Sequence, residues 1–214
     1  MAVDRFTDRR EAGRALAERL AALDLIDPVV LALPRGGVPI GREVADRLDA
    51  PLEVFVTRKI GAPHQPELAI GAVAEGGTVL IDDNTAAQLG LNDDVMAELT
   101  RRVEYDVEER VAHYRGARRL PSLHGRTAII VDDGLATGFT AEAAVRAVRA
   151  LRPAHIVMAA PVCSTQAAQF LATIADAVEF VICPPRLGAV GNWYADFRQV
   201  ADADVRALLD APPS

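Results

Sequence analysis

Short apolar runs alternate with amphipathic helical segments along most of the chain, and this alternation is the strongest constraint on its fold. Runs with the composition of buried strands lie at residues 28–33, 51–57, 127–131, 155–162 and 178–183. Helical periodicity is found before and between them, at residues 8–23, 38–48, 140–151 and 165–175. Near-continuous apolar strands separated by helices are typical of a parallel sheet that helices cover on both faces. The sequence therefore predicts an α/β fold with a mostly parallel, twisted sheet.

The middle of the chain breaks this pattern. Residues 58–68 (RKIGAPHQPEL) contain two prolines and a glycine without periodicity, which favours a loop. The runs AIGAV and TVLI flank residues 75–77 (EGG), a combination typical of a β-hairpin. Residues 92–115 are predicted to form one long inserted helix, with Asn92 as its cap and a narrow apolar stripe that packs on the domain or on a partner subunit.

The chain is predicted to form a single domain, residues 1–214. Its 214 residues are close to the usual ~100–200 residues per domain, and neither a repeat nor a linker divides them. We expect a core over about 28–183 and a small C-terminal hood over about 184–214, with the N-terminal segment as a further candidate part of the hood.

Charge and composition exclude several classes of protein. The formal net charge is −7, whereas a general nucleic-acid binder needs a basic surface to neutralise phosphates. No apolar run approaches the ~20 residues that span a bilayer, and no secretory signal is visible. Cys163 and Cys183 lie far apart in apolar stretches without metal-ligand spacing. We therefore expect a cytoplasmic protein with neither nucleic-acid nor membrane partners, which binds any anionic ligand locally.

The best candidate for a ligand site follows the strand at 127–131. Two carboxylates, Asp132 and Asp133, come first, and then a loop of small residues leads into a helix near Thr140. Main-chain N–H groups at a helix start bind phosphate well. Here they belong to Ala136, Thr137, Gly138 and Phe139.

The carboxylates before this loop suit a different part of the same ligand. They repel phosphate but accept hydrogen bonds from hydroxyl groups beside it, or hold a metal ion. A phosphate next to a vicinal diol is the pattern of a ribose 5-phosphate, and Thr137 and Thr140 add hydroxyl donors. The alternative is an ordinary capped helix next to two solvated aspartates.

The stretch VDDGLATGFT resembles the signature with which type I phosphoribosyltransferases bind phosphoribosyl pyrophosphate (PRPP). Two further segments in the expected order support the resemblance, which spans most of residues 28–200. It implies that Thr137, Gly138 and Thr140 anchor the 5′-phosphate and that Asp132 and Asp133 bind the 2′ and 3′ hydroxyls.

The segment LALPRGGVPIG (residues 31–41) resembles the pyrophosphate loop of this family. By that resemblance Arg35 grips pyrophosphate, while Gly36 and Gly37 bring main-chain amides close because they carry no Cβ. A strained or cis peptide is expected near residues 34–36. The alternative is a plain strand-to-helix turn, and neither a GxGxxG nor a Walker loop occurs in the chain.

Residues 57–68 occupy the position of the family's mobile catalytic loop. There Lys59, the only lysine of the chain, would neutralise the departing pyrophosphate together with Arg58. Glu67 is a candidate general acid or base toward a base nitrogen, with a solvated surface glutamate as the alternative. In the C-terminal hood, Trp193 and Tyr194 are candidates for stacking on the nucleobase, with packing inside the hood as the alternative.

The resemblance implies a transferase that converts PRPP and a nitrogenous base to a nucleoside 5′-monophosphate and pyrophosphate, as in nucleotide salvage. Mg²⁺ would be the cofactor, carried largely by PRPP with Asp132 and Asp133 as possible ligands, and the family is commonly homodimeric. The acceptor base stays open, because Ala136 stands where enzymes for 6-oxopurines usually carry an aspartate. Two alternatives remain: a PRPP-sensing regulator without transfer, and an α/β phosphohydrolase that adds Asp82 and Asp83 to a metal site.

Overall fold

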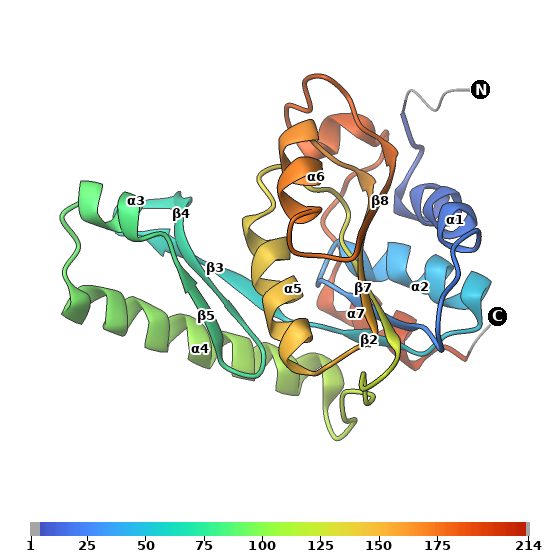
Figure 1. Cartoon of the computed structure of the whole chain (residues 1–214), viewed down its shortest axis with the longest axis horizontal. Coiled ribbons are helices and arrows are strands. Elements are labelled where there is room, and N and C mark those ends of the chain that lie inside the picture. Colours follow the sequence, from blue (N-terminus) through green and yellow to red (C-terminus); the bar gives the residue numbers. More distant parts are fainter. Residues whose placement is uncertain (1–4, 213–214) are drawn as a thin grey trace.

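A computed structural model describes residues 5–212, the side chain of Glu67 excepted, and contains a five-stranded parallel sheet at its centre (Figure 1). Its strands lie in the order β2-β1-β6-β7-β8, and every neighbouring pair is parallel. In chain order they are β1 Val29–Ala32, β2 Leu52–Val54, β6 Thr127–Val131, β7 His155–Val162 and β8 Ala177–Ile182. The predicted α/β fold with a parallel sheet is confirmed.

Helices cover both faces of this sheet. The helices α1 (Arg9–Leu20) and α2 (Gly37–Leu48) pack on one face, and α5 (Phe139–Ala150) and α6 (Thr165–Leu171) pack on the other. Successive strand residues point to opposite faces, so Val30 and Ile129 join the α1/α2 core while Leu31 and Ile130 join the α5 core. Because both faces are buried, the strands read as unbroken apolar runs rather than as alternating ones.

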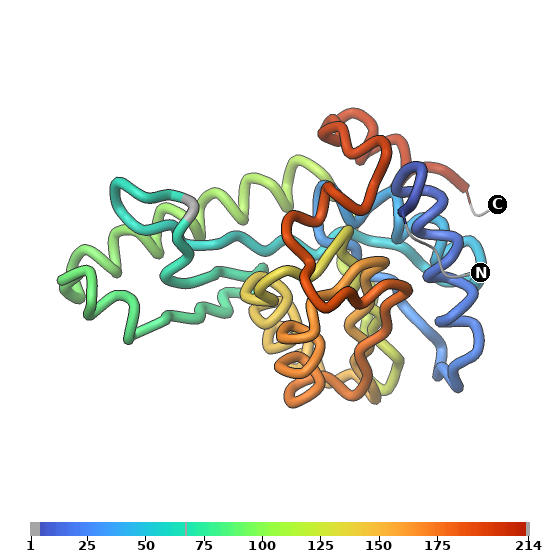
Figure 2. The backbone as a smooth tube through the Cα atoms, turned by 90° about the horizontal axis from the view of Figure 1, so that it is seen from above, coloured from blue at the N-terminus to red at the C-terminus, as the bar shows by residue number. Residues whose placement is uncertain are grey.

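The inserted segment forms an arm, residues 57–115, that extends from one side of the core (Figures 1 and 2). It contains a three-stranded antiparallel sheet in the order β3-β4-β5, the short helix α3 and the long helix α4. The bounds are β3 Thr57–Ala62, β4 Gln65–Ala74, β5 Thr78–Ile81, α3 Asp83–Gln88 and α4 Asp93–Arg115.

Two of the predictions for this segment are confirmed. The hairpin between β4 and β5 turns at Gly76 and Gly77, whose φ angles of 85° and 82° are easily reached only by glycine. The long helix begins where predicted, because the Asn92 side chain accepts a hydrogen bond from the Val95 N–H at 3.0 Å. Its apolar stripe packs on the arm's own sheet and on the C-terminal helix, with Val107 and Tyr114 buried.

The prediction of a loop over residues 58–68 is wrong. Most of this segment is paired as β3 and β4, joined by a tight turn at Pro63 and His64. Pro63 lies in the turn and Pro66 lies near the start of β4. Gly61 leaves room for the main chain of Pro66, where an added Cβ would lie 2.6 Å from the carbonyl oxygen. The residues that suggested a loop are therefore those that let a hairpin turn and bulge.

The C-terminal segment returns to the core and packs beside the segment that precedes α1. It contains a short 3-10 turn, Val190–Trp193, and the helix α7, Asp202–Asp210. The Phe6 N–H donates to the Trp193 carbonyl at 2.9 Å, and the Ala195 N–H donates to the Phe6 carbonyl at 2.8 Å. No described helix is both long and apolar enough to cross a membrane.

A buried ionic cluster ties α4 of the arm to the ends of β2 and β4. Arg115 is 8% exposed, and its Nη2 donates to the Val54 carbonyl at 2.7 Å and to both carboxylate oxygens of Glu75 at 3.0 Å. Glu53, also buried, accepts from the Arg118 Nε at 3.1 Å. Burial raises the pKa of Glu75 even though Arg115 opposes the shift. The buried Glu75 carboxylate therefore depends on Arg115.

Replacing Arg115 with alanine should lower the free energy of unfolding by about 3–5 kcal/mol, because the Glu75 and Glu53 carboxylates lose their buried cation. Arg101→Ala is the matched control, since Arg101 lies on the same helix and pairs with Glu98 on the exposed surface. Urea denaturation of both variants measures the effect. Equal losses in the two variants would contradict this role.

Candidate functional site

The loops after β1 and β6 meet at the carboxyl ends of their strands, which is where ligands bind in open α/β sheets. Their contact requires two glycines. A Cβ on Gly36 would lie 1.9 Å from Oδ2 of Asp133, and a Cβ on Gly37 would lie 2.4 Å from the carbonyl oxygen of Val131. The peptide bond between Pro34 and Arg35 is cis, within the segment where the sequence predicts an unusual peptide.

Asp132 and Asp133 lie at the centre of this contact. Oδ1 of Asp132 accepts a hydrogen bond from the Asp133 N–H at 2.8 Å. Burial and the neighbouring Asp133 carboxylate raise the pKa of Asp132 well above its usual range. Burial also raises the pKa of Asp133, although an arginine beside it opposes the shift. Two adjacent, half-buried carboxylates destabilise the fold unless a ligand or a cation compensates their charge.

That arginine is Arg9, which the sequence analysis missed. Its Nε and Nη2 donate to Oδ2 of Asp133 at 3.0 and 2.8 Å, and its Nη1 donates to the Arg198 carbonyl at 2.9 Å. The guanidinium carbon also lies 3.9 Å from the centre of the Phe197 ring. The sequence did contain a signal for Arg9. A basic residue at the start of a helix interacts unfavourably with the helix dipole, so its presence there indicates an acidic partner elsewhere.

The start of α5 follows the two aspartates. Gly138, with a φ of 80°, caps the helix without any side-chain hydrogen bond to its first N–H groups. A hydrogen bond fixes this loop to the start of α6, because the Ser164 hydroxyl donates to the Ala136 carbonyl at 2.7 Å. Thr137 is exposed at its tip, whereas Phe139 and Thr140 are half-buried. N–H groups at an uncapped helix start are available to an anion.

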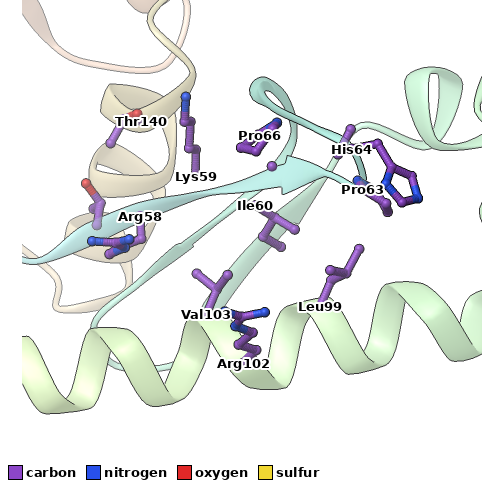
Figure 3. A pocket seen from close by; sticks show the side chains of 13 residues that line it. Arg58, Lys59, Ile60, Pro63, His64, Pro66, Leu99, Arg102, Val103 and Thr140 are labelled. Carbon is purple, nitrogen blue, oxygen red and sulfur yellow. The ribbon is translucent and has the colours of Figure 1, made fainter.

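The arm brings Lys59 and Arg58 beside this helix start. Both residues and Thr140 line one cavity of about 700 Å³, called here the arm cavity (Figure 3). Lys59 extends from β3 on the side of Thr140. Nη2 of Arg58 lies 3.8 Å from Oδ2 of Asp106, and burial, with the charge of Arg110, lowers the pKa of Arg58. The side chain of Glu67, a predicted general acid or base, lies outside the described part of the chain.

Arg35 faces a different neighbour. Its Nη1 lies 3.6 Å from Oδ1 of Asp202, which opens α7 and accepts a hydrogen bond from the Tyr114 hydroxyl. Its side chain is 27% exposed, so it can reach solvent or a ligand. Arg35 thus joins the loop after β1 to the C-terminal helix.

The prediction that Tyr194 stacks on a base is wrong. Its ring is 1% exposed and packs against Phe197 and Phe6, with centroid distances of 5.0 and 5.7 Å. Its hydroxyl donates to the Asp133 carbonyl at 2.6 Å, which fixes the residue inside the hood. Trp193 is half-buried and donates its indole N–H to the Leu187 carbonyl at 2.9 Å. Stacking by Trp193 stays a prediction.

The carboxylates that a phosphohydrolase would need are not next to Asp132. Asp82 instead caps α3 in the arm, where Oδ1 accepts a hydrogen bond from the Thr85 N–H at 3.0 Å. Among residues 5–212, no three histidine, cysteine, aspartate or glutamate side chains are grouped to hold a metal ion. These positions remove the support for the phosphohydrolase interpretation.

Comparison with known families fits the geometry of the strand ends. Residues 3–181 match the phosphoribosyl transferase domain. The chain belongs to the phosphoribosyltransferase family. Two Mycobacterium tuberculosis proteins, Rv0571c and MT0597, named provisionally as phosphoribosyl transferases, are each 43% identical to it over 205 residues. The match covers 96% of this chain and 46% of theirs, so the chain spans about half the length of these curated relatives.

Solved structures share this phosphoribosyltransferase fold. The protein TT1426 from Thermus thermophilus is 42% identical, with a TM-score of 0.81 over 96% of this chain and 97% of its own. A hypothetical protein from Neisseria gonorrhoeae, solved with bound ppGpp, is 12% identical with a TM-score of 0.51 over 94% of this chain and 91% of its own. The second likeness concerns the fold alone.

The two signature aspartates of this family member should respond unequally to neutralisation. Asp132→Asn keeps the oxygen that accepts from the Asp133 N–H but removes a half-buried charge, so it should raise the free energy of unfolding by on the order of 1 kcal/mol at neutral pH. Asp133→Asn should raise it less, because the charge that it removes is already partly compensated by Arg9. Thermal and urea unfolding measure both variants.

The gain from Asp132→Asn should depend on pH. The folded state raises the pKa of Asp132, so the protonated side chain favours folding below the unfolded pKa, and this contribution is lost as the pH rises through the folded pKa. The free energy of unfolding of the variant should therefore exceed that of wild type most at neutral pH and least at acidic pH. An equal or larger gain from Asp133→Asn would contradict the assignment of Arg9 to Asp133.

Proposed function

We propose that this member of the phosphoribosyltransferase family transfers ribose 5-phosphate from PRPP to a nitrogenous base and releases pyrophosphate. One observation supports it most: two half-buried carboxylates directly precede a helix start that no side chain caps, at the end of β6. Carboxylates that can accept hydrogen bonds from a diol thus lie next to N–H groups that can donate to a phosphate. Binding of a ribose 5-phosphate requires both.

In this proposal each part of PRPP has its own residues. Main-chain and hydroxyl groups of Thr137, Gly138 and Thr140 bind the 5′-phosphate. Asp132, and the oxygen of Asp133 that Arg9 leaves uncovered, accept from the 2′ and 3′ hydroxyls. The bond between C1′ and the pyrophosphate oxygen breaks, and a bond between C1′ and a nitrogen of the acceptor base forms. The proton of that nitrogen is transferred to a general base or to solvent.

Pyrophosphate carries away the electron pair of the broken bond, so its charge grows in the transition state. Arg35 and the amides around Gly36 and Gly37 would bind it from the loop after β1. Lys59, with Arg58, would stabilise it from the arm, since Lys59 lines the same cavity as Thr140. Preorganised cations that meet developing charge are among the largest catalytic contributions.

The residues present fit a magnesium ion that arrives with its substrate. Mg²⁺ prefers oxygen ligands and usually binds through one or two carboxylates together with substrate phosphates. Asp132 and Asp133 supply carboxylates here, and Arg9 already neutralises part of the second. When bound, Mg²⁺ would offset the negative charge of the pyrophosphate.

Pyrophosphate release from PRPP and Mg²⁺, measured across a panel of bases, tests the proposal. Wild type should turn over with at least one base. Lys59→Ala should lower kcat by about 100-fold or more, because it removes a cation that acts on the leaving group, while the Kd for PRPP changes far less. Lys59→Arg keeps the charge and should restore part of the rate.

Two other outcomes are informative. Tight PRPP binding without turnover on any base would favour a PRPP-sensing regulator. Absence of PRPP binding would contradict both the transferase and the sensor.

A further inference from the structure

Helix α4 leaves one long side uncovered. Its inner side packs on the arm sheet and on α7, whereas the opposite side faces away from the arm sheet (Figure 1). The side chains there form one stripe, because they recur every three or four residues. We call this stripe the outer face of α4. Its members are all exposed: Glu98, Arg101, Arg102, Tyr105, Glu108, Glu109 and Ala112. Tyr105 lies at its middle and is 61% exposed.

The charges of the outer face form two blocks around Tyr105. The arginine pair, Arg101 and Arg102, lies four and three residues before it, and the glutamate pair, Glu108 and Glu109, lies three and four residues after it. Reversing the direction of the helix about Tyr105 therefore exchanges the basic block with the acidic block. A face with this property is complementary to a second copy of itself, as the interface of a two-fold dimer must be.

Ion pairs within the helix do not account for the glutamate pair. Such pairs join residues that are three or four positions apart. The residues at these distances from either glutamate include no arginine or lysine: Glu104, Tyr105, Asp106, Val111, Ala112 and His113. The arginine pair lies seven residues away, which is about 10 Å along the helix axis. Glu109 accepts a hydrogen bond from the Tyr105 hydroxyl at 3.0 Å, which leaves its charge uncompensated. The acidic block therefore has no strong cation within reach on its own helix.

Antiparallel packing of two α4 helices would supply that cation. With a two-fold axis at Tyr105, residues equally far before and after it in the two copies lie at the same height. The arginine pair of each copy then faces the glutamate pair of its partner. The two tyrosine rings meet at the axis, where the aliphatic parts of the arginine side chains can cover them. The arrangement also places opposite ends of the two helix dipoles side by side.

The shape of the molecule leaves α4 available for such a contact. The arm extends from one side of the core, and α4 runs along it for 23 residues, or about 35 Å (Figures 1 and 2). The outer face spans the central part of this length. A second helix can therefore pack along several turns of α4.

We propose that the outer face of α4 is an interface between two copies of this chain, packed antiparallel about a two-fold axis at Tyr105. The partner is a second copy because both charge blocks that the contact needs are present on the one helix. The interface does not depend on the proposed transfer reaction. Because charge pairs form most of it, salt should weaken it.

Sedimentation equilibrium tests the proposal. Wild type should show a concentration-dependent equilibrium between monomer and dimer, and the dimer Kd should rise about ten-fold or more between about 50 mM and about 500 mM NaCl. Reversal of one block should raise the Kd by at least about ten-fold, since like charges then face each other. The two reversals are Arg101→Glu with Arg102→Glu, and Glu108→Arg with Glu109→Arg.

Combinations of these variants separate a specific contact from a general effect of charge. An equimolar mixture of the two double variants should form heterodimers, because one outer face is then entirely acidic and the other contains four arginines. All four substitutions in one chain should restore the wild-type Kd. The matched control is Arg10→Glu with Arg14→Glu, which makes the same change in net charge as the arginine-pair reversal, on the exposed side of α1. It should leave the Kd unchanged.

A cross-link tests the position of the axis. Tyr105→Cys should form an intermolecular disulfide under mild oxidation, because its two copies meet at the axis. Glu98→Cys lies on the same face but should not, since its two copies would be about 21 Å apart along the helices. Both variants also carry Cys183→Ser, because Cys183 is partly exposed whereas Cys163 is buried.

The outcomes that would overturn the proposal are distinct. Wild type that stays monomeric at every concentration would reject the interface. A dimer that neither reversal weakens, or a mixture of the two double variants that stays monomeric, would assign dimerisation to another surface. Equal cross-linking of Tyr105→Cys and Glu98→Cys would reject the antiparallel arrangement about Tyr105.

Discussion

The structure depends on two neighbouring, half-buried carboxylates at the end of β6, those of Asp132 and Asp133. A charged pair of this kind is costly in a low-dielectric environment, and the elements around it are arranged to compensate. Arg9 reaches Asp133 from α1, and the Tyr194 hydroxyl holds the Asp133 main chain from the hood. Gly36 brings the loop after β1 against the same carboxylate, a position that no side chain could share. Three segments that are distant in sequence thus converge on these two residues. The Asp132 charge remains uncompensated, and a bound diol would offset its cost by hydrogen bonding.

The arm gives this site its cations and depends on a second ionic cluster. Arg115 fixes the end of α4 to the ends of β2 and β4. β3 in turn places Lys59 beside Thr140 and leaves its outer edge open. In the proposed reaction the core would supply groups for the sugar phosphate, and the arm would supply groups for the leaving group. Preorganisation of both parts by buried ion pairs suits a reaction whose catalysis is mostly positioning and electrostatics.

Much of this could be predicted from the sequence, and the failures have physical causes. The parallel sheet follows from unbroken apolar runs, and the strand-end site from the composition of VDDGLATGFT, because both depend on local pattern. Arg9 could not be placed, since its partner lies 124 residues away. The stacking prediction for Tyr194 failed because an aromatic residue in an irregular segment can either stack on a ligand or pack in the protein, and the sequence does not distinguish the two. β3 was missed because proline and glycine mark bulged, turning hairpins as well as loops.

The most direct measurement of the central claim is a crystal structure with PRPP and Mg²⁺ bound. The account predicts the 5′-phosphate on the amides between Thr137 and Thr140, with the ribose diol on Asp132. It also predicts that Arg9 stays bonded to Asp133 while the pyrophosphate lies between Arg35 and Lys59. A sugar phosphate seated away from the end of β6, or one whose diol does not touch Asp132, would contradict the account.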